Sequence, residues 1–191
     1  EDNSGQISYL VMLGTGAQIN AESQYNGVSL YAIGSQTQIS NVAVINGADD
    51  GIEFFGGSVA TENLYLDNNQ DDAVDWTEGW NGSATNTYVS HTTGNFSTAL
   101  EADGENGNPT LTNFTAIANP TGGTALQFKK LSGATMTNVL LMGYDTNVDM
   151  KDEGPIGNVI IDGTPMGDAS DDVFNGTAVD ISGWAWIAAR L

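Results

Sequence analysis

Apolar and polar side chains alternate with a period of two in a short motif that recurs along the chain. Each copy contains a small residue, an apolar residue, a polar or acidic residue and a second apolar residue. The first apolar position recurs at spacings of 22, 22, 26, 26 and 22 residues. Alternation of this kind is typical of half-buried β-strands. The copies lie at residues 29–32, 51–54, 73–76, 99–102, 125–128 and 147–150.

A second column lies downstream in each unit, where an asparagine precedes an apolar, variable, apolar triplet. Gly, Asn, Asp and Thr separate these segments at intervals too short for helices. Leucine-rich repeats have a similar period, but the second half of each unit is β-like and the leucine signature is missing. Stacked asparagines at a bend can hydrogen-bond between rungs, and Asn tolerates a left-handed backbone. The column contains Asn41, Asn63, Asn86, Asn113, Asn138 and Asn158.

The sequence therefore predicts an all-β fold, a right-handed parallel β-helix (solenoid) of about six to seven coils with an asparagine ladder and a C-terminal cap. Residues 1–167 form the coils, the first of them incomplete. Residues 168–191 drop the repeat and form a capping segment, in which Trp184, Trp186, Ile187 and Leu191 close the last coil. Two inward stripes form the core: Ile52, Phe54, Val74, Leu100, Leu126, Phe128, Val148 and Met150, and Val42, Val44, Leu64, Leu66, Val139, Leu141, Val159 and Ile161.

Charge limits the partners of this chain. Its 191 residues include 24 acidic and 4 basic side chains, for a net charge of −20, and no cysteine. Nucleic acid and anionic membranes are excluded because phosphates would be repelled, whereas cations and neutral glycans remain compatible. Thiol nucleophiles, disulfides and zinc-thiolate sites are excluded, and no apolar run is long enough for a membrane helix. The acidic, Gly/Asn/Thr/Ser-rich composition favours an extracellular or cell-surface location, and the start at Glu1 rather than Met suggests a mature or excised piece of a longer polypeptide.

The segments "DDGIEFFGGSV" from Asp49 and "DDAVDWTEGW" from Asp71 resemble those of a known family. A widespread group of bacterial secreted or surface-anchored proteins, often called hypothetical lipoproteins, carries a DDGFEFFGGTV-like segment followed by a GDDSFDWDEGW-like segment. The likeness extends from "NSGQISYL" at residues 3–10 to the closing "SGWAW". It implies a pectate-lyase-like β-helix outside a bacterial cell, in a group whose biochemical activity is largely unassigned.

Five outward positions of the motif form one predicted column: Glu53, Asp75, Glu101, Gln127 and Asp149. Neighbouring rungs lie about 4.8 Å apart, so adjacent carboxylates need a proton, a cation or a ligand to neutralise them. In one interpretation Glu53, Asp75 and Glu101 are catalytic. Carboxylates one or two rungs apart approach the ~5 to 5.5 Å of retaining glycosidases or the ~6.5 to 9.5 Å of inverting ones.

A second interpretation assigns the acidic turns to a metal ion. Paired aspartates precede two consecutive motif copies, and the loop "DGENGN" adds further oxygen ligands. Ca²⁺ takes six to eight such ligands, so these turns are predicted structural calcium sites. In a third interpretation the acids form a solvated face whose repulsion salt screens. The candidate metal ligands are Asp49, Asp50, Asp71, Asp72, Asp103 and Glu105.

Aromatic and basic residues complete the candidate set. Trp76 falls in an inward column and is predicted to be core, whereas Trp80, Tyr88 and Tyr31 are candidate ligand-binding rings, with Tyr31 in the same column as the acids. The single histidine, His91, excludes a three-histidine metal site and a histidine-centred triad, and it is predicted to lie in a surface loop. The three lysines, Lys129, Lys130 and Lys151, are predicted ion-pair partners for Glu101 or Asp149.

These features lead to two functional hypotheses. The first is a β-helix module with a binding or structural role toward a neutral glycan or a surface protein, with Ca²⁺ holding the acidic coils. Its incomplete first coil also suggests association end to end, or with a missing N-terminal part. The alternative is a glycoside hydrolase-like, polysaccharide-degrading enzyme that uses outward carboxylates on adjacent coils, a hypothesis that rests on fold analogy.

Overall fold

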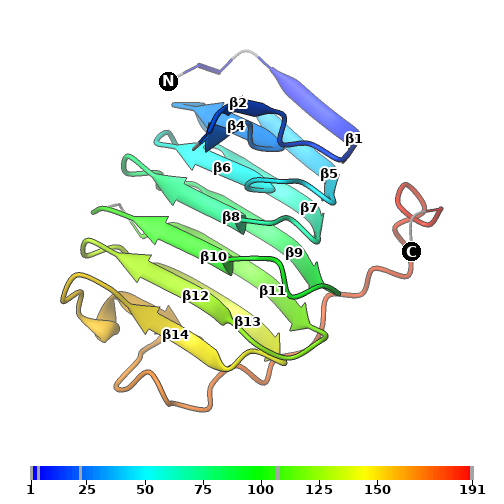
Figure 1. Cartoon of the computed structure of the whole chain (residues 1–191). Helices are drawn as coiled ribbons and strands as arrows, with labels where there is room; N and C mark the ends of the chain where they lie inside the picture. The colour runs from blue at the N-terminus through cyan, green and yellow to red at the C-terminus, as the bar shows by residue number, and fades with distance from the viewer. Residues whose placement is uncertain (1, 4, 22, 106–107, 190–191) are drawn as a thin grey trace.

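Two parallel sheets wind through the computed structural model, which describes residues 2–3, 5–21, 23–105 and 108–189 (Figure 1). The long-strand sheet contains, in spatial order, β1 (Gln6–Leu13), β5 (Gln38–Ile45), β7 (Ala60–Asp67), β9 (Ser83–His91), β11 (Thr110–Ala118), β13 (Ala134–Met142), β15 (Val159–Ile161) and β16 (Thr164–Pro165). The short-strand sheet contains β4 (Val28–Tyr31), β6 (Ile52–Phe55), β8 (Asp72–Thr77), β10 (Thr98–Asp103), β12 (Thr124–Lys129) and β14 (Thr146–Met150). A small hairpin joins β2 (Gln18–Asn20) to β3 (Ser23–Gln24), and η1 (Ile156–Asn158) is a 3₁₀ helix.

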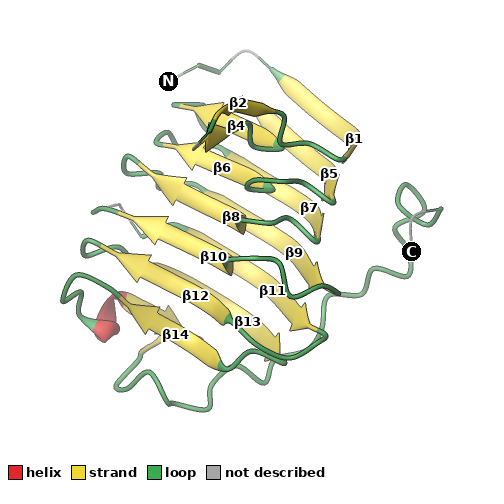
Figure 2. Ribbon diagram, viewed as in Figure 1, coloured by secondary structure: helices red, strands yellow, loops and turns green. Residues whose placement is uncertain are grey.

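Each coil supplies one strand to each sheet, so that strands stack on their counterparts one repeat away (Figure 2). The pairing is parallel throughout both sheets apart from the final β15–β16 turn. The fold is a right-handed parallel β-helix of about five turns, which confirms the predicted fold class with slightly fewer coils. The count is lower because the last unit forms only η1 and the three-residue strand β15 before the chain turns back. Within the described ranges, no helix is long and apolar enough to cross a membrane.

The core consists of the two predicted inward stripes. Fifteen of the sixteen predicted residues belong to one buried apolar cluster and Met150 packs against it; Trp76 is also a member, which confirms its predicted core position. Most of these side chains are completely buried, and Met150, on the last short strand, is half-buried. Each square ångström of apolar surface that is buried stabilises the folded state by ~25 cal/mol, so the stacked stripes are the main source of stability.

Asparagine side chains form a ladder along the long-strand sheet. The Nδ2 of Asn63 donates to the Oδ1 of Asn41 at 2.9 Å. Asn86, Asn113 and Asn138 continue the series at 3.0, 2.8 and 2.9 Å, each donating to the rung before. All five have φ between 54° and 58°, a left-handed backbone that Asn adopts more readily than most residues. The ladder is thus confirmed for five of the six predicted positions.

The ladder ends at both extremes of the solenoid. Asn158 is not a member, contrary to the prediction, because β15 pairs with the start of β13 and places Val159 beside Ala134. Its Nδ2 donates instead to the backbone oxygen of Leu131 at 2.9 Å. In the first coil Tyr9 occupies the ladder position, with φ of 58°.

The left-handed asparagines divide each long strand into two arms. In the first arm of β5, Ile39 faces the core while Gln38 and Ser40 alternate with it and face outward. In the second arm, Ala43 and Ile45 face outward but are covered by the C-terminal segment. The long-strand sheet therefore presents one open face and one covered face.

The C-terminal segment packs in two places, and only the first of them is at the last coil. Met166 and Phe174 join the main core cluster at the last coil. The chain then runs back beside the long-strand sheet (Figure 1), where Ile187 packs with Ala43, Ile45 and Tyr65. Trp184 and Trp186 stack on each other, with ring centroids 5.5 Å apart, against this second cluster.

The prediction that Trp184, Trp186 and Ile187 close the last coil is therefore wrong. The outward positions of the second arms are apolar or aromatic, and these residues cover that face of the early coils. The fourth residue of the predicted cap, Leu191, lies outside the described residues.

Candidate functional site

One outward column of the short-strand sheet carries the predicted line of acids. Strand pairing places Glu53 beside Asp75, Asp75 beside Glu101, Glu101 beside Gln127 and Gln127 beside Asp149. This register confirms the predicted column.

Lysines neutralise the lower part of the column. The Lys129 ammonium pairs with the Glu101 carboxylate, and Lys151 pairs with Asp149 at 2.6 Å, as predicted. Lys130 pairs with Asp103 at 3.0 Å. Glu101 therefore has its counter-charge within the protein, unlike the acids nearer the N-terminal end.

A shared proton neutralises the upper part of the column. The side chains of Glu53 and Asp75 are hydrogen-bonded to each other, and Asn26 donates to the second oxygen of Glu53. Burial, reinforced by Asp50, Glu53, Asp72 and Glu101, raises the pKa of Asp75 to about 9. One oxygen of Asp75, Oδ1, is buried and has no hydrogen-bond partner within the described residues. Asp75 is therefore protonated at neutral pH.

The paired aspartates of the two turns build a hydrogen-bonded stack. The backbone N–H of Asp72 donates to Oδ1 of Asp50 at 3.0 Å. Asp72 in turn accepts from the backbone N–H of Thr98 at 2.8 Å and from its hydroxyl at 2.7 Å. Burial raises the pKa of Asp50 to about 8 and that of Asp72 to about 7. Asp71 and Asp72 thus repeat the turn of Asp49 and Asp50, as the sequence predicts.

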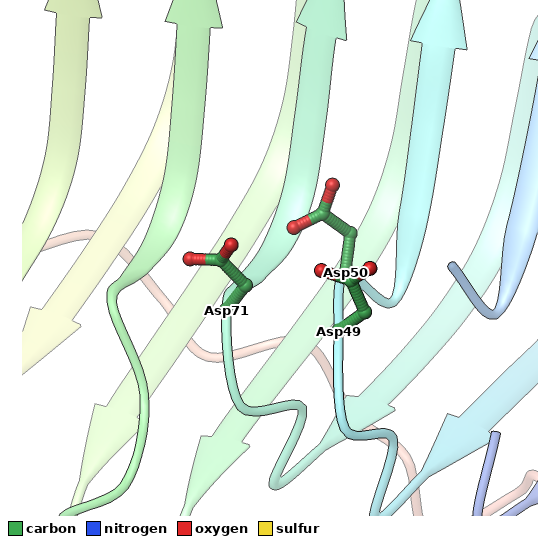
Figure 3. Close-up of side chains that lie close together, drawn as sticks. All are labelled: Asp49, Asp50 and Asp71. Carbon is green, nitrogen blue, oxygen red and sulfur yellow. The ribbon is translucent and has the colours of Figure 1, made fainter. Parts of the chain in front are cut away.

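Three of the predicted metal ligands converge. Carboxylate oxygens of Asp49, Asp50 and Asp71 lie within 4.8 Å of one another, on the loops that enter β6 and β8 (Figure 3). Asp50, Glu53 and Asp75 form a second such group. Asp72 is engaged with Thr98, Asp103 pairs with Lys130, and neither they nor Glu105 belong to these groups. Asn106 lies outside the described residues.

The upper acids open into a groove, here called the acidic groove, with a volume of about 440 Å³. Tyr25 and Tyr31 are 60% and 65% exposed, which leaves their rings available to a ligand. Tyr31 stacks on Phe55, with ring centroids 4.3 Å apart. The groove is lined by Ile19, Ser23, Gln24, Tyr25, Asn26, Ser29, Tyr31, Asp49, Asp50, Glu53, Phe55 and Asp71.

The predicted alignment of the first coil is wrong by two residues. Ser29, rather than Tyr31, pairs with Glu53, and Tyr31 pairs with Phe55. Tyr31 nevertheless faces outward, because strand side chains alternate with period two. Sequence reasoning missed Tyr25 and Asn26 because both precede β4, outside the repeated motif.

Two predicted binding rings lie elsewhere. Trp80 is completely buried, stacks on Phe54 at 4.0 Å and donates from Nε1 to the backbone oxygen of Val59. Its burial contradicts a role as an exposed sugar platform. Tyr88 stacks on Tyr65 and packs beneath the C-terminal segment, on the long-strand sheet. The acidic groove therefore contains only Tyr31 of the three predicted rings.

His91 also differs from its prediction, because it is buried rather than in a surface loop. It ends β9, its ring stacks on Phe96 at 3.8 Å, and its Nδ1 is 3.1 Å from the Tyr144 hydroxyl. Burial lowers the pKa of His91 to about 4, so that it is neutral at pH 7.

Comparison with known proteins supports the fold and adds no assigned activity. Neither the search of curated proteins nor that of solved structures gave a match. A family model for the pectate-lyase-like β-helix domain matches residues 1–173, which include every coil and the whole acidic groove. The chain belongs to the pectate-lyase-like β-helix domain family.

Proposed function

We propose that this chain is an extracellular or cell-surface β-helix module that binds a neutral glycan in the acidic groove. The observation that carries the proposal is the meeting of exposed Tyr25 and Tyr31 rings with buried carboxyl groups in one groove. Aromatic rings offer flat apolar surfaces to a ligand, and polar groups beside them fix its orientation. A groove of about 440 Å³ suits a short saccharide better than the broad surface of a protein partner.

The protonation state of the groove at neutral pH suits hydrogen bonding to a neutral ligand. With a pKa of about 8, Asp50, which lines the groove, keeps its proton at neutral pH. A protonated carboxyl both donates and accepts hydrogen bonds, as a sugar hydroxyl does. The net charge of −20 disfavours a polyanionic glycan.

Calcium would complement this role at the edge of the groove. Asp49, Asp50 and Asp71 offer hard oxygen ligands of the kind that Ca²⁺ takes. Burial, followed by the charge of Asp71, raises the pKa of Asp49, so an ion here would displace protons. The cation would tie together the turns of two successive coils.

A panel of soluble neutral oligosaccharides tests the proposal by isothermal titration calorimetry. We expect Tyr31→Ala to weaken binding at least tenfold, because the ring is exposed and its loss leaves the core intact. Tyr9→Ala is the matched control, since Tyr9 is 67% exposed and does not line the groove. Absence of wild-type binding to every neutral glycan would refute the proposal.

A glycoside hydrolase is the second candidate, favoured by the adjacent carboxyl groups of Glu53, which lines the groove, and Asp75. The two side chains are hydrogen-bonded to each other, closer than the ~5 to 5.5 Å that a retaining acid and nucleophile need. Glu101, the third predicted catalytic carboxylate, is neutralised by Lys129. These contacts support binding over hydrolysis. Release of reducing ends from any panel member by the wild type, lost in Glu53→Gln, would reverse that preference.

A further inference from the structure

A second groove lies on the long-strand sheet, between the asparagine ladder and the C-terminal segment, and we call it the ladder groove. It has a volume of about 280 Å³ and shares no lining residue with the acidic groove. This volume is slightly below the ~300 to 1,000 Å³ of clefts that bind drug-sized ligands, so the ladder groove suits a smaller molecule. One side is lined by Asn86, Asn113 and Asn138, and the other side includes Val179, Asp180 and Trp184.

Hydrogen bonds fix the C-terminal segment beside the ladder, so that both walls of the groove exist before a ligand binds. The Asn138 side chain accepts from the backbone N–H of Thr177 at 2.7 Å and donates to its backbone oxygen at 3.1 Å. The backbone N–H of Val179 donates to the hydroxyl of Thr115, on β11, at 2.9 Å. Further along, Trp184 packs against the second apolar cluster. A preformed site pays a smaller ordering cost when it binds.

The ladder leaves part of its hydrogen-bonding capacity available to a ligand. A side-chain amide carries two N–H donors and an oxygen with two lone pairs. Asn86 donates to Asn63 at 3.0 Å and accepts from Asn113 at 2.8 Å, and Asn113 accepts in turn from Asn138 at 2.9 Å. Neither Asn86 nor Asn113 makes another side-chain hydrogen bond within the residues that the structure describes. Each therefore keeps one donor and one lone pair, on rungs that lie ~4.8 Å apart.

The opposite wall supplies an aromatic ring and one carboxylate. Trp184 stacks on Trp186, with ring centroids 5.5 Å apart, and remains partly exposed. Asp180 is exposed, and its Oδ1 accepts from the backbone N–H of Ser182 at 2.9 Å, which orients the carboxylate. Asp180 is the single charged side chain among the described residues that line the groove. The groove thus combines an apolar surface, amide donors and an anionic acceptor.

These groups suit an uncharged ligand that carries hydroxyls. The net charge of −20 disfavours an anion, and a cation finds four carboxyl groups in the acidic groove but one here. A sugar hydroxyl can accept from an amide N–H of the ladder and donate to Asp180, because a hydroxyl does both. The C–H face of a sugar ring is apolar and can lie on the flat ring of Trp184.

We propose that the ladder groove is a second binding site, which takes one ring of a neutral saccharide. The site is independent of the acidic groove, because the ladder belongs to the long-strand sheet and the acidic column to the short-strand sheet. Two sites on two sheets would allow one chain to hold two glycans and bridge them.

NMR titration of the isotope-labelled full chain with the methyl glycosides of glucose, galactose, mannose and xylose tests the proposal. We expect the side-chain amide signals of Asn86 and Asn113 to shift and to saturate with at least one of these sugars, because their free N–H groups contact the ligand. Absence of any shift of these two signals with every sugar overturns the ladder groove. Shifts that tetramethylammonium causes and no sugar causes assign the groove to a cation and overturn the proposal as well.

Two variants remove the groups of the opposite wall. We expect Asp180→Asn and Trp184→Leu each to raise the dissociation constant of that sugar at least tenfold. Asp180 is exposed, so its replacement leaves the packing of the segment intact even if Trp184→Leu disturbs it. Asp168→Asn is the matched control, because Asp168 also accepts from the N–H of a serine two residues further on, at 2.9 Å, but does not line the groove.

The variant Tyr31→Ala separates the two grooves, because Tyr31 lines only the acidic groove. Shifts of the ladder amides that persist in Tyr31→Ala and weaken in Asp180→Asn support the ladder groove. Equal affinities of the wild type, Asp180→Asn and Trp184→Leu overturn it and leave the acidic groove standing.

Discussion

Glu53 and Asp75 are hydrogen-bonded to each other across two coils of the solenoid, because β6 and β8 place them in register. Two carboxyls so close share a proton rather than ionise together. Burial raises the pKa of Glu53 as well as that of Asp75, and the hydrogen bond that Asn26 donates to Glu53 opposes part of that rise. A proton therefore neutralises the upper coils, whereas Lys129 and Lys151 neutralise the lower ones.

The raised pKa values of the buried carboxyl groups predict that the free energy of unfolding falls as pH rises. In the folded chain the pKa values of Asp50, Asp72 and Asp75 are about 8, 7 and 9, all above the ordinary aspartate value of 3.8. The folded state thus binds more protons than the unfolded state, and the free energy of unfolding decreases between about pH 4 and pH 9. His91, with its pKa lowered from 6.5 to about 4, acts in the opposite sense below pH 6.5. Thermal melts from pH 6.5 to 9 isolate the carboxyl contribution.

Asp75→Asn should flatten this dependence, because an amide cannot ionise. We expect the melting temperature of the variant to exceed that of the wild type by several degrees at pH 9, and the two to converge toward pH 5. One pKa unit corresponds to ~1.4 kcal/mol, and 1 kcal/mol to ~2 to 4 °C for a chain of this size. Asp149→Asn is the control, since Asp149 is paired with Lys151. Equal slopes in wild type and Asp75→Asn would contradict the shared proton.

Calcium should stabilise the chain more at high pH than at low pH. Protons and Ca²⁺ compete for Asp49 and Asp50, whose pKa values are raised, so an ion bound by the Asp49, Asp50 and Asp71 group gains affinity as Asp49 and Asp50 ionise. At one hundred times the dissociation constant, a ligand of the native state adds ~2.7 kcal/mol. We expect Ca²⁺ to raise the melting temperature at pH 8, EDTA to reverse the rise, and Asp71→Asn to abolish it. Asp172→Asn, at an exposed position outside the cluster, should behave as wild type, and no calcium shift in the wild type would exclude the site.

The sequence was most informative where the repeat is regular. Period-two alternation and the asparagine spacing predict the two stripes, the ladder and the acidic column, since stacking on the preceding coil fixes register and direction together. The Lys129–Glu101 pair also follows, because Lys129 is two residues beyond Gln127, the neighbour of Glu101 in the column.

Prediction failed where the repeat breaks. The predicted register of Tyr31 is wrong by two residues because the first coil lacks the acid that marks later copies: Ser29 stands opposite Glu53, and Gly27 is the small residue. The sequence predicts accessible positions for Trp80 and His91, but both are buried. Trp80 stacks on Phe54 and His91 stacks on Phe96. Residues 175–189 follow the apolar outward face of the second arms. The apolar composition of this segment indicates that it covers something, but does not indicate which face of the solenoid it covers.

Lys129 should be the lysine whose loss matters most. Lys129→Met removes the counter-charge of Glu101, whose side chain is only 12% exposed. Removing one partner of a buried pair costs ~3 to 5 kcal/mol, and partial exposure reduces this to ~1 to 2 kcal/mol by solvent screening. Lys130→Met is the control, because Lys130 is 66% exposed. Denaturant unfolding at pH 8 should show a larger loss for Lys129→Met, and equal losses would remove the special role of Glu101.

The asparagine ladder should contribute through both its hydrogen bonds and its backbone. Asn86 donates to Asn63 and accepts from Asn113, with φ of 57°. Asn86→Ala loses both hydrogen bonds, which costs ~0.5 to 1.5 kcal/mol of unfolding free energy for each. It also places alanine, which has no polar side chain, in the left-handed backbone region, at a further cost of ~1 to 2 kcal/mol. Asn86→Gly loses the bonds but tolerates the backbone. We therefore expect unfolding free energies in the order wild type, Asn86→Gly, Asn86→Ala, from highest to lowest.

Asn158 provides the matched control for this series. It lies outside the ladder and makes one hydrogen bond, to the backbone oxygen of Leu131. Asn158→Ala should therefore cost no more than ~1.5 kcal/mol, less than either ladder variant. If Asn86→Gly were as stable as wild type, the hydrogen bonds between rungs would contribute nothing to stability, and the ladder asparagines would serve only to bend the long strands. If Asn86→Ala matched Asn86→Gly, the left-handed backbone would carry no cost, and the bonds alone would account for the loss.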